Sequence, residues 1–294
     1  MVRKLLRAAL IASVAITVSS PASATQWGNY HWATTNKVLT VSVNKSIDPT
    51  AWAVAVDGAI SDWDNNWRNY STVQSYDHLT LRAGTLSPDP KKCSPINGQI
   101  LVCDAAYGQR QWLGIANIWT SGDHILKATT RLNDSYFASG FYNKPEWRNM
   151  VACQEIGHDF GLDHQDTVQT NLNLGTCMDY TNDPAAVGSA GLNNEHPNKA
   201  DFDSLDSSGM YGHADSTATA TFAASATNFG IRAVGQAVLP SDDAPGGLTA
   251  AEWGTPIHRD ARGRADTFVR HLGAGRKLLT HVFWALDAKG NEAN

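Results

Sequence analysis

The stretch from Cys153 to Asp166, CQEIGHDFGLDHQD, constrains the fold more than any other part of the chain. A run with no proline or glycine before Gly157 leads into it, so a helix is predicted over residues 147–160. Gly161 suits the C-cap of that helix, because glycine adopts positive φ at little cost and lets the chain turn back. The stretch therefore predicts a helix followed at once by a tight reversal.

The polar side chains of this stretch are spaced for metal chemistry. Gln154 and His158 lie four residues apart, so on a helix they face the same side, with Glu155 beside them. His164 comes three residues after Gly161 and is returned to that side by the reversal. Two imidazoles and an adjacent carboxylate are what a zinc site with a general base requires. We predict His158 and His164 as metal ligands and Glu155 as the catalytic base.

The third ligand is open between two oxygen donors. Gln154 occupies a suitable helix position, and its side-chain oxygen reaches further than an imidazole would. Asp166 offers an anionic oxygen, which binds zinc better than an amide oxygen does. Asp166 has the alternative role of orienting His164 through its other ring nitrogen. Placement favours Gln154, whose alternative is a purely structural role that leaves only two protein ligands.

Residues 1–24 predict a secretory signal peptide. The basic leader MVRKLLR precedes the apolar run AALIASVAITV, which is too short to span a bilayer, and an A-x-A pattern ends at Ala24. We therefore expect an exported, extracellular protein without a membrane segment after cleavage. A formal net charge of −5 over 294 residues, with scattered Lys and Arg, argues against a nucleic acid partner. A monomer is expected.

Export makes disulfides the natural interpretation of the four cysteines, for which three connectivities exist. Cys93 and Cys103 bracket the short segment SPINGQILV, whose turn residues suit a hairpin-like loop. Pairing these two leaves Cys153 to pair with Cys177. A cysteine–histidine metal cluster is the alternative, and the lack of any C-x-x-C spacing disfavours it.

Hydrophobic periodicity elsewhere predicts an α+β fold. Helices are expected at residues 50–70, 147–160 and 200–211, and strands at 37–43, 78–81, 113–119 and 124–132. The predicted domains are a catalytic domain at 25–214, a linker at 215–250 and a small β-hairpin region at 251–294. The hairpin is expected either to pack against the preceding domain or to form an independent element.

Two motifs together resemble those of the metzincin zinc proteases. Residues 154–164, QEIGHDFGLDH, resemble the pattern H-E-x-x-H-x-x-G-x-x-H with the first histidine replaced by Gln154. Residues 175–180, GTCMDY, resemble the Met-turn of that family. The resemblance implies that Met178 forms a hydrophobic floor beneath the metal and that Tyr180 reaches toward it. Over residues 37–212 the order of elements is similar to that of the matrixin catalytic domain.

The resemblance implies a metzincin-like domain with a twisted mixed sheet, an active-site helix and a zinc-dependent hydrolase activity on peptide bonds. In such a metalloprotease, Tyr180 stabilises the oxyanion, and the edge strand at residues 114–119 pairs with an extended peptide or protein substrate. Structural calcium is a further cofactor in proteins of this kind, with no site assigned to it here. The alternative is a secreted protein that keeps the scaffold and binds peptide or protein without catalysis.

Overall fold

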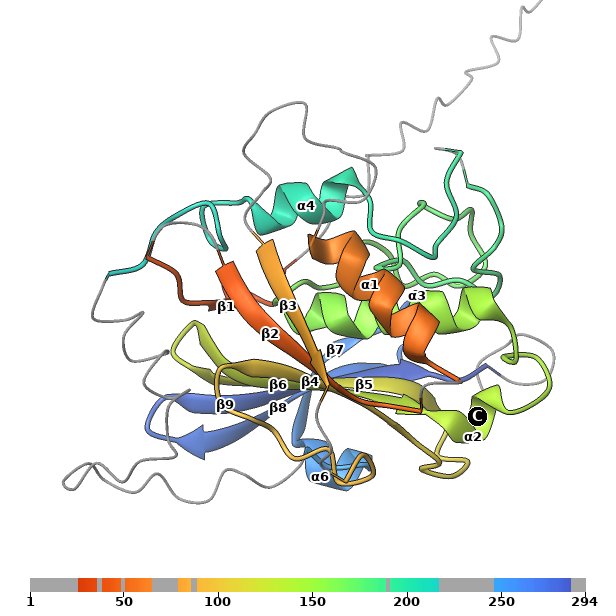
Figure 1. Cartoon of the computed structure of the whole chain (residues 1–294), viewed down its shortest axis with the longest axis horizontal. Coiled ribbons are helices and arrows are strands. Elements are labelled where there is room, and N and C mark those ends of the chain that lie inside the picture. The colour runs from red at the N-terminus through yellow and green to blue at the C-terminus, as the bar shows by residue number, and fades with distance from the viewer. Residues whose placement is uncertain are drawn as a thin grey trace, which may run out of the picture.

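The computed structural model describes residues 26–35, 39–48, 51–64, 79–85, 89–188, 191–216 and 246–286. These residues form an α+β fold built on one mixed sheet with a few helices, as predicted (Figure 1). The predicted signal peptide and most of the predicted linker lie outside the described residues. No helix within the described ranges is long and apolar enough to cross a membrane.

The first half of the sheet is parallel. It contains β2 (Leu39–Ser46), β3 (Leu79–Thr85), β4 (Gln99–Ala105) and β6 (His124–Asn133), in the order β3-β2-β4-β6. The two-residue strand β1 (His31–Trp32) also runs parallel to β6 and pairs with its first residues. The predicted strands at 37–43, 78–81 and 124–132 are therefore present, each with slightly shifted ends.

The second half of the sheet is antiparallel and includes the C-terminal residues. Strand β5 (Trp112–Ser121) pairs with β6 on one side and with β9 (Arg276–Trp284) on the other. Strands β8 (Ala265–Gly273) and β7 (Thr255–Arg259) follow outward. The predicted C-terminal hairpin is thus present as β8–β9, and it packs against the preceding part of the chain rather than standing apart.

This pairing corrects one expectation. The strand at residues 114–119 was predicted to be an edge open to a substrate, but β9 pairs with it along its whole length, with Ala116 opposite His281. Nine of the ten residues of β5 are buried. A strand that is covered on both edges and both faces has no hydrogen-bonding groups left for a peptide.

Helices α1 (Ala53–Asp64) and α3 (Pro145–His158) lie together over one face of the sheet (Figure 1). Helix α3 begins with proline in its first turn, where the missing N–H costs nothing. After α3, Gly161 has φ +92°, and a Cβ there would lie 1.8 Å from the carbonyl oxygen of Tyr30. The predicted glycine reversal is confirmed, and only glycine fits this approach.

The remaining helices are short. They are α2 (Asp134–Phe137), α4 (Lys199–Leu205) and α6 (Ala250–Trp253). Helix α4 begins with a capping box between Asn198 and Asp201 and ends six residues before the predicted end at residue 211. The three residues at 207–209, Ser-Ser-Gly, explain the early end, because serine and glycine favour turns over helix interiors.

Both predicted disulfides are present, Cys93–Cys103 and Cys153–Cys177. The interpretation of residues 93–103 as a hairpin-like loop was wrong, because residues 99–105 form the buried strand β4 between β2 and β6. A short apolar run that is buried on both faces shows no alternation, so it gave no strand signal of period two. Disulfides such as these persist in oxidising compartments.

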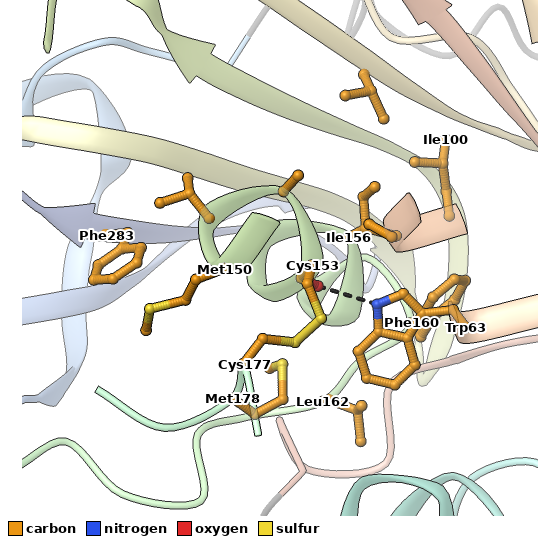
Figure 2. Packing of buried hydrophobic residues seen from close by; sticks show 14 of the residues in the cluster. Trp63, Ile100, Met150, Cys153, Ile156, Phe160, Leu162, Cys177, Met178 and Phe283 are labelled. Carbon is orange, nitrogen blue, oxygen red and sulfur yellow. Dashed lines mark hydrogen bonds between the residues drawn. A yellow bond between two sulfur atoms is a disulfide. The ribbon is translucent and has the colours of Figure 1, made fainter. Parts of the chain in front are cut away.

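The main hydrophobic core lies between the sheet and helices α1 and α3 (Figure 2). Trp63 of α1 packs edge-on against Phe160, and its indole Nε1 donates a hydrogen bond of 3.1 Å to the carbonyl oxygen of Cys153. This bond joins the two helices at the start of the motif. A smaller cluster covers the opposite face of the sheet, where Trp253 lies against Trp284 of β9.

A buried carboxyl on β4 predicts a pH-dependent stability. Burial raises the pKa of Asp104 from 3.8 to about 7, and the nearby Asp134 carboxylate adds to the rise. Because the folded state favours the protonated acid, the contribution of Asp104 to the free energy of unfolding is largest below about pH 4. This contribution is lost as the pH rises through about 7. Asp104→Asn should therefore gain stability over the wild type between about pH 5 and pH 8, on the order of 1–3 kcal/mol.

Urea unfolding at about pH 5 and at about pH 8, with the disulfides intact, measures the difference in stability between Asp104→Asn and the wild type. Asp89→Asn is the matched control, because Asp89 is exposed and its substitution should leave the pH dependence unchanged. Parallel pH profiles for the wild type and Asp104→Asn would contradict the assignment.

Candidate metal centre

Three buried histidines converge beside helix α3. His158 is the last residue of α3, His164 follows the Gly161 reversal, and His281 lies on β9. One nitrogen of each ring lies within 4.8 Å of the corresponding nitrogens of the other two. The ring centroids of His158 and His281 are 3.9 Å apart, and those of His164 and His281 are 4.6 Å apart. The two predicted imidazoles are therefore brought together, and a third joins them from the C-terminal hairpin.

His281 was not among the predicted site residues, although its segment carries a signal. On β9, Leu279 and Phe283 belong to the main core on the α3 side, whereas Val282 faces the opposite cluster. Because side chains alternate along a strand, His281 must share the face of Leu279 and Phe283. The inward orientation of His281 on the predicted hairpin could thus have been predicted from the sequence, but its proximity to His158 and His164 could not.

The hydrogen bonding of His158 leaves one nitrogen for a metal. Its Nδ1 lies 2.8 Å from the carbonyl oxygen of Leu162, so Nδ1 carries the proton and Nε2 presents a lone pair. This Nε2 has no hydrogen-bond partner among the described residues. The ring is held from behind by Trp27, stacked at 4.8 Å between centroids with an interplanar angle of 2°. An oriented ring with a bare inward nitrogen is what a metal ligand requires.

The environment keeps the rings of His158 and His281 in the neutral, metal-binding form. Burial lowers the pKa of His158 well below its usual value, and the neighbouring His164 lowers it further. Burial also lowers the pKa of His281, with His158 adding to the effect. Neutral imidazole is the form that coordinates metal ions. These described residues can hold a metal ion, and a set of nitrogen donors suits zinc better than calcium.

Glu155 lies at the same centre and contacts the new histidine. Its Oε2 is 3.3 Å from His281 Nδ1, and both side chains are fully buried. Burial raises the pKa of Glu155 well above its usual value, and Asp159 raises it further. Gly114 of β5 makes room for this side chain, since a Cβ there would lie 2.7 Å from Glu155 Cγ. The carboxylate of Glu155 therefore lies beside the three histidines and contacts His281, and its role as a base stays a prediction.

Tyr180 also reaches the centre. Its hydroxyl lies 3.2 Å from His281 Nε2 and 3.3 Å from Asp266 Oδ2, and its ring packs edge-on against His164. Asp266, on β8, accepts a hydrogen bond of 2.6 Å from His258 Nδ1. His164, His258 and Asp266 form a second group with metal-ligating geometry. The C-terminal strands thus surround the centre with polar groups that local motifs did not predict.

The two candidates for the third ligand are placed differently. Gln154 is buried, and its Nε2 donates a hydrogen bond of 2.6 Å to the carbonyl oxygen of Cys177. Its Oε1 has no hydrogen-bond partner within the described ranges, so its role as a ligand stays a prediction. Asp166 instead accepts hydrogen bonds from the Val168 backbone, at 2.6 Å, and from the Asn171 side chain.

The expectation that Asp166 orients or replaces a ligand is therefore corrected. Asp166 belongs to none of the metal-competent groups that the described residues form. The carboxylate beside His164 is that of Asp163, whose Oδ1 is 3.4 Å from His164 Nδ1. Asp166 uses its side chain to hold its own loop, because short acidic side chains bond readily to backbone N–H groups two residues ahead.

Met178 is buried against helix α3 (Figure 2), and its expected place beneath a bound metal stays a prediction. A Cβ added to Gly157 of α3 would lie 2.6 Å from the Met178 sulfur and 2.8 Å from the Trp63 ring. The Cys153–Cys177 disulfide fastens the same turn to the same helix. The backbone N–H of Gln165 bonds to the Met178 carbonyl at 2.7 Å, which ties the turn to the loop carrying His164.

No protein-family model matches this chain, and no curated protein matches it. The assignment of the centre therefore depends on the motif and on the geometry given above.

The contact between Gly157 and Met178 can be tested with a matched pair of helical glycines. Gly157→Ala should lower the free energy of unfolding by about 1–3 kcal/mol, because its methyl group overpacks against Met178 and Trp63. Gly58→Ala in α1 has open space around the new methyl group and should raise stability by about 0.5–1 kcal/mol through helix propensity. Denaturant unfolding measures both, and equal effects would contradict the close packing of the Met-turn on α3.

Proposed function

We propose that the protein is a secreted zinc metalloendopeptidase, held latent in the described state by its own C-terminal hairpin. One observation carries the proposal: β9 pairs along β5 and places His281 against His158, His164 and Glu155. The hairpin thereby covers the edge of β5 on which a peptide substrate would pair. It also adds a third imidazole where the metal would bind, and it contacts Glu155, the base that peptide hydrolysis needs.

The donor set supports zinc in particular. His158 and His164 supply two imidazoles in the spacing that the motif predicts, and His281 supplies a third from β9. Three imidazole nitrogens with a buried carboxylate next to them are typical of zinc centres. Without an ion, a bare ring nitrogen in a dry site leaves a polar group unsatisfied, which costs about 1–3 kcal/mol.

The closed geometry supports latency. Glu155, His158 and His281 have no exposed surface, so a peptide cannot reach them while β9 is in place. Since β9 is antiparallel to β5, it takes the place of an extended substrate segment on that edge. His281 then acts as a removable ligand, and departure of β9 leaves the metal with His158, His164 and the predicted Gln154.

In the open state the chain's own groups take over the chemistry. Zinc, when bound, supplies a Lewis acid that polarises the scissile carbonyl and lowers the pKa of a water. Glu155, released from His281, accepts the proton of the attacking water at its carboxylate and delivers it to the departing amine. Tyr180, whose hydroxyl no longer contacts His281, donates a hydrogen bond to the developing oxyanion. The vacated edge of β5 aligns the substrate backbone.

The burial of the three histidines favours a second candidate function. If β9 never leaves β5, the three histidines form a permanent structural metal centre in a secreted protein without catalysis. Peptide or protein binding would then need a surface other than the covered cleft, because β5 has no open edge. The two functions differ in what loss of His281 does to activity.

His281→Ala should create activity if the hairpin is inhibitory. The substitution removes the bond that ties β9 to the metal, so hydrolysis of a short fluorogenic peptide in excess zinc should rise at least about tenfold over the wild type. Hydrogen exchange of the β9 amides should accelerate in parallel. His271→Ala is the control, because His271 lies exposed on the same hairpin. Loss of bound zinc with no turnover would instead support the structural centre.

Glu155→Gln should abolish whatever peptidase activity the His281→Ala variant shows. The amide cannot accept the proton of the attacking water, so kcat/KM should fall by about 100-fold or more. The near-equal size of Gln should leave the fold and zinc content unchanged, which zinc analysis of the double variant checks. Undiminished activity in the double variant would remove Glu155 from its proposed role.

A further inference from the structure

A second histidine cluster lies outside the centre described above and shares no residue with it. His31 is on β1, His124 begins β6, and His213 and Asp215 follow α4. Three ring nitrogens face the same atom, Asp215 Oδ1. The Nε2 atoms of His31, His124 and His213 lie 3.5, 3.0 and 3.5 Å from it. Segments from both ends of the described chain thus meet around one carboxylate oxygen.

The hydrogen bonding of His31 leaves its second ring nitrogen, Nε2, facing Asp215 without a partner. His31 Nδ1 lies 2.7 Å from the carbonyl oxygen of Asn29, so Nδ1 carries a proton and donates it. Nε2 of the neutral ring then presents a lone pair toward Asp215 Oδ1, which is also an acceptor. The His31 side chain is 4% exposed, and its Nε2 has no hydrogen-bond partner among the described residues. Two buried acceptors that face each other are stable only with a proton or a metal ion between them.

Asp215 is held in place for such a role. Its Oδ2 accepts a hydrogen bond of 2.7 Å from the Thr34 backbone N–H, and its own N–H donates one of 2.6 Å to the Thr34 carbonyl. These two bonds fix the carboxylate with Oδ1 toward the rings. Such hydrogen bonds to a ligating carboxylate orient it and raise the precision of a metal site.

The rings surround the oxygen instead of stacking on one another. The centroids of His31 and His124 are 4.9 Å apart with the planes at 71°, and those of His31 and His213 are 4.9 Å apart at 75°. The ligand-capable atoms of His31, His124 and Asp215 all lie within 4.8 Å of one another. His213 lies next to this group, with its Nε2 3.5 Å from Asp215 Oδ1, and its Nδ1 has no hydrogen-bond partner in the described part of the chain.

A proton alone satisfies this cluster poorly. His124 Nε2 can donate its proton to Asp215 Oδ1 at 3.0 Å, but His31 Nε2 stays without a partner, and charging both rings would add like-charge repulsion at 4.9 Å between centroids. A divalent cation engages every ring and the carboxylate at once. Histidine nitrogens with one carboxylate oxygen are a donor set that zinc accepts in tetrahedral geometry.

We propose that His31, His124, His213 and Asp215 form a second, structural zinc-type site that joins the N-terminal segment to the start of β6 and to the chain after α4. Four protein ligands leave no open coordination position, which is typical of structural sites. The site also supports the first centre, because the segment it anchors carries Trp27, which stacks on His158. This inference goes beyond the proposed function and does not depend on it.

Zinc content of the purified full-length chain, measured by mass spectrometry after dialysis, tests the proposal. The wild type should hold about two zinc ions per chain, and Asp215→Asn and His124→Gln about one each. The double variant His158→Gln/His164→Gln should also hold about one, in the second site. His196→Gln is the matched control, because His196 pairs with Asp62, at 2.6 Å, and belongs to none of the metal-competent groups of the described residues, so its loss should leave two ions.

Cobalt(II) titration of His158→Gln/His164→Gln provides a second measurement that needs no change at the second site. An intense visible spectrum of tetrahedral cobalt supports the site. A spectrum of octahedral aqueous cobalt alone, or equal zinc content in the wild type, Asp215→Asn and His124→Gln, would overturn it. Failure of the proposed function gives a different result, in which only the zinc that depends on His158 and His164 is missing.

Discussion

The pairing of β9 with β5 is the interaction on which the rest of the structure depends. It joins the C-terminal strands to the sheet, covers the edge of β5, and carries His281 to the two histidines of the motif. Each consequence follows from strand geometry, since a ladder fixes the register and the register fixes which side chains face α3. A shift of one residue would turn His281 to the opposite face and leave His158 and His164 without their third neighbour.

The motif helix and its turn were predictable because their causes are local. Helix periodicity, the positive φ of Gly161 and the cysteine spacing each act within a few residues, and each is observed. The third histidine was not predictable in the same way. His281 is 117 residues beyond His164, and only the sheet order brings the two together. The same holds for His31 and Asp215, which are joined by the fold and by no shared motif.

Strand β4 shows a second limit of sequence patterns. Its apolar run is buried on both faces, so the alternation that identifies half-exposed strands is missing. The turn residues just before it therefore led to the prediction of a hairpin-like loop. Asp166 shows a third limit. Its charge made it a plausible ligand, but a carboxylate two residues before a backbone N–H is more readily used to close its own turn. Local competition of this kind is invisible until the loop conformation is known.

The presence of Gln154 in place of a histidine changes how the centre can be controlled. A ligand on α3 is permanent, because the helix is fixed by the core, by Trp63 and by the Cys153–Cys177 disulfide. A ligand on β9 is held by the ladder with β5 and by the packing of Leu279 and Phe283 in the main core. Gln154 meanwhile uses its amide N–H to bond Cys177, which stabilises the helix against the Met-turn whether or not β9 is in place. With an amide at this position of α3, the third imidazole of the centre comes from β9, so the group of three histidines is complete only when the C-terminal hairpin is paired with β5.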